Sequence, residues 1–276
     1  MKVVQVKSEE QATSSIQFLK ECGSCNLYLY EGLSMNSSRH HNLLFYEKNA
    51  ICGVLHTKTG KTAHILLSGR VHGDMAGMVL RAVLRRFGMI RSIFGDRDSI
   101  VRLAEEEGAE KFSLREYQFM EVEKQTFKEA MKTGGVVPPI EDVPLLFPLQ
   151  RQYEIEEMEV DASLLDPEKM TTSLARRIGR GDVTALYEEG RPVAIAGVNS
   201  RYGATCQIGS VYVLPAYRRK GYGYRVVSSH VSRLLRRYSR IVLFVDVKNR
   251  LAARLYETVG FRKCGMLAQL GIKQSY

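Results

Sequence analysis

The sequence lacks the features that mark membrane spans, disulfide frameworks and metal centres. Its apolar runs are all shorter than the about 20 residues that a membrane-spanning helix needs, although 45% of its 276 residues are hydrophobic. The five cysteines are odd in number and irregularly spaced, which argues against a disulfide framework. Cys22 and Cys25 form a lone CxxC, and His40 and His41 have no partners at ligand spacing, so we predict no metal site. These absences, with the apolar content, favour a packed globular protein.

The N-terminal residues MKVVQVKSEE indicate a strand followed by a polar turn. A signal peptide would need a longer apolar region. We therefore expect a cytoplasmic protein without a membrane partner.

The formal net charge of +10 favours an anionic partner, namely a nucleotide cofactor, a nucleic acid or an acidic protein surface. Arg233, Arg236, Arg237 and Arg240 fit a solvated basic helix face. They are not interleaved with aromatic residues in the manner of single-strand-binding proteins. Nucleic-acid binding is therefore a weak hypothesis.

The most informative stretch is VYVLPAYRRKGYG, residues 211–223. A β-branched run ends at Pro215, a basic triplet and a GYG turn follow, and an amphipathic helical pattern extends to Arg237. Glycines allow backbone N–H groups to approach a ligand closely, and a helix N-terminus carries partial positive charge. The order of strand, glycine-rich turn and helix predicts a phosphate or pyrophosphate site.

Several kinds of glycine-rich turn are alternatives for this stretch. No GxxxxGK[ST] string occurs, which excludes a P-loop, and Val226 stands where a dinucleotide fingerprint needs its third glycine. Arg218, Gly221 and Gly223 satisfy RxxGxG. An ordinary basic connection between a strand and a helix fits the turn equally well when it is taken alone.

The sequence after this turn distinguishes these alternatives. Residues 241–247, IVLFVDV, predict a buried strand, and NRLAARLYETVGF follows at residues 249–261. Asn249 is suited to cap a helix that Gly260 ends. Tyr256 shares one face of that helix with Ala252, Leu255 and Val259.

These two signatures, RRKGYG and NxxAxxLYxxxGF, resemble those of the GNAT acetyltransferase superfamily from about residue 143 onward. The resemblance implies a mixed sheet splayed open to admit acetyl-CoA between two strands. It implies that Tyr256 lies near the sulfur and donates a proton to the departing thiolate. Without these motifs, a core-packing role would be preferred for Tyr256. The implied acetyl-CoA contacts are the strand residues Val211, Tyr212 and Val213, the pyrophosphate turn Arg218, Arg219, Lys220, Gly221, Tyr222 and Gly223, and Asn249.

The resemblance predicts an N-acetyltransferase in which a primary amine attacks acetyl-CoA directly within a ternary complex. The strand before the turn has no carboxylate, so the general base cannot be taken from the family. Glu156 and Glu157, on a helix that Pro148 would begin, are candidates, and Asp246 or water are alternatives. A non-catalytic protein that binds acyl-CoA is the second hypothesis.

The chain is predicted to contain two copies of one mixed α/β fold, with a degenerate copy at residues 1–131, a linker at 132–140 and the acetyl-CoA-binding copy at 141–276. RLAEEEGAEK, residues 102–111, aligns with RLYETVGFRK, residues 254–263. Ala104 then corresponds to Tyr256. The first copy has Gly69 and Gly73 without RxxGxG spacing, and Asp74 would repel a pyrophosphate. The expected elements of this copy are strands at 2–6, 42–46, 51–58, 62–67, 90–94 and 115–122 and helices at 9–22, 75–87 and 97–107.

Overall fold

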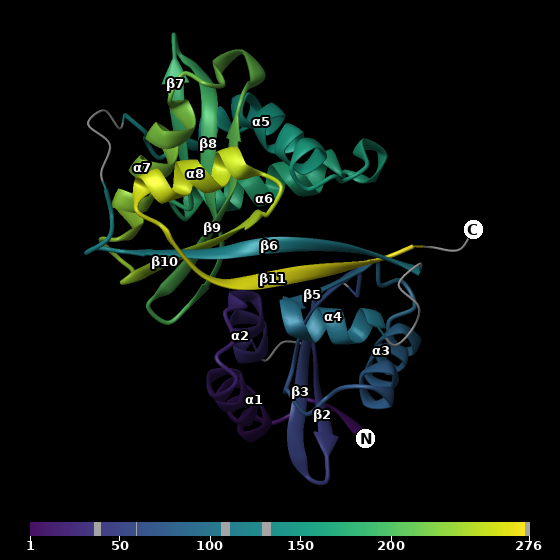
Figure 1. Ribbon diagram of the computed structural model, residues 1–276. Helices are drawn as coiled ribbons and strands as arrows, with labels where there is room; N and C mark the ends of the chain where they lie inside the picture. Colours follow the sequence, from purple (N-terminus) through teal and green to yellow (C-terminus); the bar gives the residue numbers. More distant parts are fainter. Residues whose placement is uncertain (36–39, 59, 106–110, 129–133, 274–276) are drawn as a thin grey trace. The chain divides into compact units, whose positions relative to one another are not determined.

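A computed structural model describes residues 1–35, 40–58, 60–105, 111–128 and 134–273 (Figure 1). Its contacts divide the chain into two units, residues 1–119 with 264–276 and residues 120–263. Both units are mixed α/β, as the sequence predicts. No helix among the described residues is long and apolar enough to span a membrane, and their His, Cys, Asp and Glu side chains form no cluster suited to a metal ion.

The first unit has a mixed sheet in the order β1-β2-β3-β4-β5-β11. Neighbouring strands are antiparallel except for β4 and β5, which are parallel. Its elements are β1 (Lys2–Gln5), α1 (Glu9–Glu21), α2 (Leu27–Ser34), β2 (His41–Glu47), β3 (Ala50–Thr57), β4 (Thr62–Leu67), α3 (Asp74–Arg86), β5 (Ser92–Asp96), α4 (Arg97–Glu105), the first part of β6 (Phe112–Glu123) and most of β11 (Arg262–Ile272).

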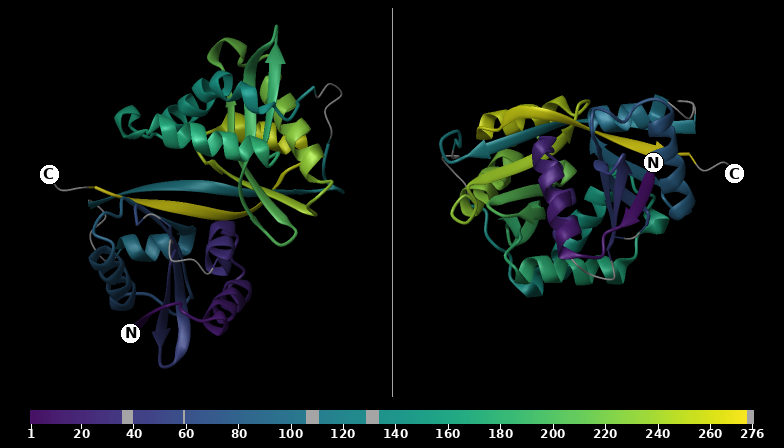
Figure 2. Two further views of the ribbon diagram at one scale, coloured as in Figure 1. Left: turned by 180° about the vertical axis from the view of Figure 1, so that it is seen from behind. Right: turned by 90° about the horizontal axis from the view of Figure 1, so that it is seen from below.

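Helices cover both faces of this sheet (Figures 1 and 2). Because side chains alternate along a strand, Leu44, Val54 and Leu66 pack with α1 and α2. The adjacent residues Leu55 and Ile65 pack with α3 and α4 on the other face. The helices therefore pack against two separate hydrophobic clusters.

The second unit repeats this arrangement with strands in the order β7-β8-β9-β10-β6. Two helices pack with one face and two with the other. Strands β7 to β9 are antiparallel, and β10 is parallel to β9. Its elements are α5 (Val143–Glu156), α6 (Pro167–Gly179), β7 (Val183–Glu188), β8 (Arg191–Tyr202), β9 (Thr205–Val213), α7 (Tyr222–Leu234), β10 (Arg240–Asp246) and α8 (Arg250–Val259).

The division into units differs from the predicted linear boundaries. The last residues of the chain, 264–276, group with residues 1–119, and β11 pairs with β5 through Leu267 to Gly271. The end of β6, residues 120–123, belongs to the second unit and contributes Met120 and Val122 to its core. Sequence patterns show where a strand lies but not which neighbour it pairs with. The two units are therefore assembled from interleaved parts of the chain.

Most predicted elements lie within a few residues of the observed ones, but α2, α6, β7 and β8 were not predicted. Helix α2 was missed because its short run, LYLYEGLS, has apolar residues on several sides rather than a helical stripe. Pro148 was predicted to begin a helix, but it lies inside α5. This helix starts at Val143 and has Pro144 in its first turn. Residues 106–110 of the aligned repeat lie outside the described residues.

The predicted basic helix face is wrong at two of its arginines. Arg233 is half-buried and donates to the carbonyl of Gly181 and the hydroxyl of Thr184. Because α7 ends at Leu234, Arg240 lies in β10, where it pairs with Glu121. The positive charge of these two side chains is therefore used within the unit.

Acid is expected to destabilise the protein through its buried histidines. Burial lowers the pKa of His64 and His230 to about 3 and that of His56 to about 4, from an ordinary value of 6.5. Below pH 6.5 the unfolded chain binds more protons than the folded chain, so the free energy of unfolding decreases as the pH is lowered. Each of these histidines is expected to lower the free energy of unfolding by about 2 kcal/mol as the pH falls from about 6.5 to 5. Urea unfolding at pH 7 and 5 measures this loss.

His64→Phe isolates the contribution of one histidine, which stacks on Tyr28. The variant is expected to lose about 2 kcal/mol less than the natural protein on acidification. Substitution of the exposed His72 by Gln serves as the control. An unchanged pH dependence in His64→Phe would contradict this account.

Candidate functional site

The candidate site of the second unit begins where β9 and β10 separate. These parallel strands pair only through Arg240–Thr205, Ile241–Cys206 and Val242–Gln207. The register between β8 and β9 shifts twice, and Ser210 has a positive φ of 49°. This bulge bends β9 away from β10. The backbone of β9 beyond Gln207 is thus left without a partner on β10.

The turn after β9 places a helix N-terminus beside this opening. Gly221 caps α7 in the left-handed conformation, with φ 83°, which glycine adopts without strain. The first bond of the helix runs from the Arg225 N–H to the Gly221 carbonyl at 3.0 Å. The N–H groups of residues 222–224 therefore have no acceptor within the helix. Together with the helix dipole they form a site for an anion.

Gly223 is required for packing rather than for its backbone angles. A Cβ atom at this position would lie 2.7 Å from Leu255 Cδ1 of α8. The glycine thus allows the start of α7 to lie close to the helix that carries Tyr256. The two signature motifs meet at this contact.

Arg218 is held by neighbours on β9 and α5. Its guanidinium donates to Glu156 Oε2 at 2.7 Å and to the Val213 carbonyl at 3.0 Å, and it stacks on the ring of Tyr212. The hydroxyl of Tyr212 also donates to Glu156, at 2.6 Å. These hydrogen bonds from Tyr212 and Arg218 lower the pKa of Glu156. Glu156 is thus a stable carboxylate that positions Arg218, and a lowered pKa makes it a weak base.

Tyr256 lies on the buried face of α8, as predicted, with its ring edge against Phe261. Burial, with the nearby Tyr153 and Glu157, raises its pKa. Burial also raises the pKa of Tyr153 to about 12, and the Tyr153 hydroxyl bonds the backbone of Ser210. The phenol of Tyr256 therefore stays protonated at neutral pH, close to the α5 helix and the β9 bulge.

Two other sequence-predicted residues have structural partners. The side chain of Asn249 accepts from the Ala252 N–H at 3.1 Å and so caps α8. The carboxylate of Asp246 accepts from the Lys248 N–H at 2.7 Å in the turn before that helix. Both side chains shape the connection between β10 and α8.

A partly buried polar chain leads from α5 to the bulge of β9. Glu154 accepts from Gln150 at 2.9 Å, Gln150 accepts from Arg177 at 3.1 Å, and Arg177 donates to the Ser210 hydroxyl at 3.2 Å. Burial raises the pKa of Glu154, against smaller lowering contributions from Gln150 and Arg177. The sequence gives no signal for Glu154 or Ser210, because neither the burial of one nor the positive φ of the other follows from a motif.

In the first unit, side chains of α4 bond the backbone at the end of β4. The Ser99 hydroxyl accepts from the Leu67 N–H at 3.0 Å, at the end of β4. Arg102 donates to the carbonyls of Ser68 and Leu67 at 2.9 and 3.1 Å. These backbone groups correspond to the ones that β9 leaves open. Asp74 occupies the first turn of α3, as expected, where it disfavours an anion.

Comparisons with known proteins agree with this geometry. Residues 149–261, which lie in the second unit, match the model of the acetyltransferase (GNAT) family. No curated protein sequence matches the chain significantly.

Solved structures resemble the chain over its whole length. A GCN5-related N-acetyltransferase from Sphaerobacter thermophilus has a TM-score of 0.68 at 13% identity, covering 99% of this chain and 97% of its own. A GNAT-family acetyltransferase from Colwellia psychrerythraea has a TM-score of 0.63 at 10% identity, covering 99% and 100%. A tandem GNAT protein from the clavulanic acid biosynthesis pathway has a TM-score of 0.62 at 13% identity, covering 100% and 99%. The chain thus has the fold of a tandem GNAT protein.

Proposed function

We propose that the chain is an acetyl-CoA-dependent N-acetyltransferase with a single active site, in its second unit. The observation that carries this proposal is the separation of β9 from β10 beside the N-terminus of α7, with Tyr256 close to the bulge. The separated strands offer backbone groups to an extended ligand, and the helix start offers N–H groups to its phosphates. A cytoplasmic location remains a prediction.

The residues around this opening fit acetyl-CoA, which would supply an activated acetyl thioester. Val211 and Val213 lie on the part of β9 that β10 does not pair, and their backbone would bond the pantetheine arm. The turn from Arg219 to Gly223 would hold the pyrophosphate, with Lys220 adding positive charge. Arg218 would keep its place through Glu156 and shape the edge of this turn.

The phenol of Tyr256 would donate to the sulfur as negative charge develops there. Its raised pKa keeps the proton on the oxygen, and the hydroxyl would stabilise the thiolate by a charge-assisted hydrogen bond. A backbone N–H group at the β9 bulge would similarly donate to the carbonyl oxygen of the thioester. The amine would attack directly, without an acyl-enzyme.

We propose Glu154 as the base that takes the proton from the amine. A catalytic base works best when its pKa lies near the working pH. Burial raises the pKa of Glu154, whereas hydrogen bonds lower that of Glu156. Glu157 is exposed at the end of α5 and remains an alternative.

The activity itself is tested by mixing the purified chain with acetyl-CoA and a panel of primary amines and following the release of free thiol. Release that depends on an amine supports the proposed function. Because β9 has no carboxylate that could act as a base, a non-catalytic acyl-CoA-binding protein is the alternative. Tight binding of acetyl-CoA without thiol release on any amine would favour that alternative.

A negative charge introduced at Gly221 is expected to weaken the binding of acetyl-CoA if its pyrophosphate lies at this turn. Asp and Asn tolerate a positive φ better than other residues, and the position of the added Cβ has no atom within 4 Å. Gly221→Asp places a negative charge against the phosphates and is expected to weaken acetyl-CoA binding by about 30-fold. Gly221→Asn has nearly the same shape without the charge and is expected to change the Kd by about twofold.

Isothermal titration calorimetry of both variants with acetyl-CoA checks this prediction. The difference between Asp and Asn is expected to shrink at high salt, because screening weakens a partly exposed charge. Equal affinities of the two variants at low salt would show that the phosphates bind elsewhere.

A further inference from the structure

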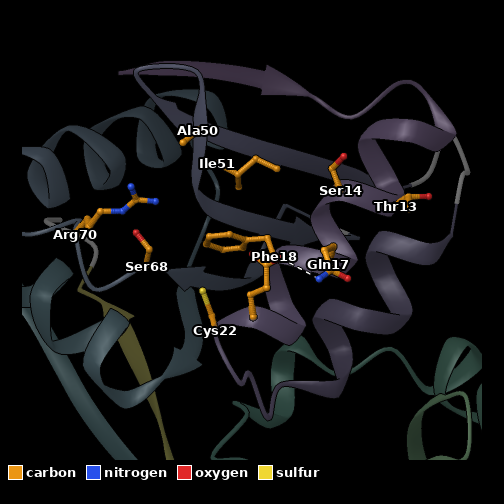
Figure 3. A pocket seen from close by; sticks show the side chains of 10 residues that line it. Thr13, Ser14, Gln17, Phe18, Cys22, Ala50, Ile51, Ser68 and Arg70 are labelled. Atoms are coloured by element: carbon orange, nitrogen blue, oxygen red, sulfur yellow. Dashed lines mark hydrogen bonds between the residues drawn. The ribbon is translucent and has the colours of Figure 1, made fainter.

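The first unit contains a cavity of about 590 Å³ that the proposed acetyl transfer does not use (Figure 3). It lies between α1, the start of β3 and the turn after β4. The corresponding elements of the second unit are α5, the start of β8 and the turn after β9, where Glu156 of α5 pairs with Arg218 of the turn.

The wall of the cavity combines an apolar surface with one cationic group. Phe18 and Ile51 supply the apolar part, and the guanidinium of Arg70 extends toward the same space from the turn after β4 (Figure 3). Arg70 is exposed, and it forms no ion pair with any residue in the described part of the chain. A cation without a partner beside an apolar wall suits a ligand with a negative head and an apolar body.

A buried hydroxyl lies beside this arginine. Ser68 lines the cavity and is 9% exposed, and its Oγ has no hydrogen-bond partner among the described residues. A buried hydroxyl without a hydrogen-bond partner is energetically unfavourable. After rotation about its χ1 bond, the hydroxyl could donate to an oxygen atom held by Arg70.

The remaining charged group of the lining is a carboxylate that already has a partner. Glu21 Oε1 accepts from Gln17 Nε2 at 2.9 Å, one turn apart on α1. Acyl-CoA is an unsuitable occupant, because Ser99 and Arg102 hold the backbone at the end of β4 and Asp74 faces the helix start. The ligand is therefore a smaller anion.

We propose that this cavity binds a small carboxylic acid with an apolar body, the carboxylate on Arg70 and Ser68 and the body against Phe18 and Ile51. Arginine pairs well with carboxylates because its N–H groups match both oxygens. This second site lies in the first unit and is independent of the proposed acetyl transfer. It gives the degenerate unit a binding role of its own.

Three probes with the same phenylbutyl body and different heads test the proposal on the full chain, without acetyl-CoA. We expect phenylbutyrate to bind at least about tenfold more tightly than phenylbutanol or phenylbutylamine in calorimetry. Arg70→Gln should remove that preference, whereas substitution of the exposed Arg85 on α3 by Gln should retain it. Equal binding of the alcohol, tighter binding of the amine, or no effect of Arg70→Gln would overturn the proposal.

Cys22 provides a readout of location that needs no substitution. It is an exposed cysteine that lines the cavity, and Cys264 is an exposed cysteine outside its lining. Partial burial and the neighbouring carboxylate of Glu21 raise the pKa of Cys22, so labelling with iodoacetamide is done at alkaline pH. Phenylbutyrate should slow labelling of Cys22 but not of Cys264, measured by peptide mass spectrometry. Equal labelling with and without phenylbutyrate would contradict binding in this cavity.

Discussion

Replacing Tyr256 by Phe is expected to lower kcat for acetyl transfer by about 100-fold, the range typical of a lost acid catalyst. The ring and its contact with Phe261 remain, so the fold should be unchanged. The lost group is one hydroxyl, which the structure places beside Tyr153 and the β9 bulge with a raised pKa. Because this hydroxyl contributes mainly when charge develops on sulfur, the Kd of acetyl-CoA should change by about twofold or less.

Steady-state thiol release and calorimetry separate these two effects. Tyr238, which also packs against the core of the second unit, provides the matched control. It lies after the end of α7, and Tyr238→Phe should leave kcat and the Kd close to those of the natural protein. A kcat for Tyr256→Phe equal to that of the natural protein would show that Tyr256 is only a packing residue.

Replacing Glu154 by Gln is expected to lower kcat/KM by about 100-fold and to remove the acid limb of the pH profile. An ionised base accepts the proton from the amine, so activity should rise as pH increases through the raised pKa of Glu154. Glutamine cannot ionise, and the residual rate of the variant should lack this rise. The amide still accepts a hydrogen bond from Gln150, which preserves the polar chain to Ser210.

Glu156→Gln and Glu157→Gln are the comparisons that decide between the three carboxylates of α5. Both variants should retain the acid limb. Glu156→Gln should instead weaken the hold on Arg218 and act mainly on acetyl-CoA affinity. A larger loss of kcat/KM in either of these variants than in Glu154→Gln would assign the base to that residue.

Local sequence patterns were sufficient to predict the elements around the acetyl-CoA turn. Asn249 and Gly260 cap α8 where the signature places them, and Tyr256 shares its buried face with Val259. These features depend on residues a few positions apart. The exposure of one helix face and the φ of one glycine follow from such spacings.

Features that depend on distant neighbours could not be predicted. The raised pKa of Glu154 comes from its partial burial, and the role of Glu156 follows from its contacts with Tyr212 and Arg218. Likewise, the pairing of β11 with β5 joins residues at opposite ends of the chain. Helix periodicity carries no information about any of these contacts.

The degenerate first unit illustrates the same limit. Its missing glycine spacing and Asp74 were visible in the sequence, and they indicated the loss of a pyrophosphate site. The sequence did not indicate that Ser99 and Arg102 would bond the end of β4. It also gave no sign of the cavity beside Arg70.

The stoichiometry of acetyl-CoA binding to the purified full chain tests the central claim most directly. We expect one acetyl-CoA bound per chain in calorimetry, because β9 and β10 separate in the second unit, whereas Ser99 and Arg102 bond the corresponding backbone of the first unit. Two molecules per chain, or one molecule whose binding is equally tight in Gly221→Asp and Gly221→Asn, would contradict it.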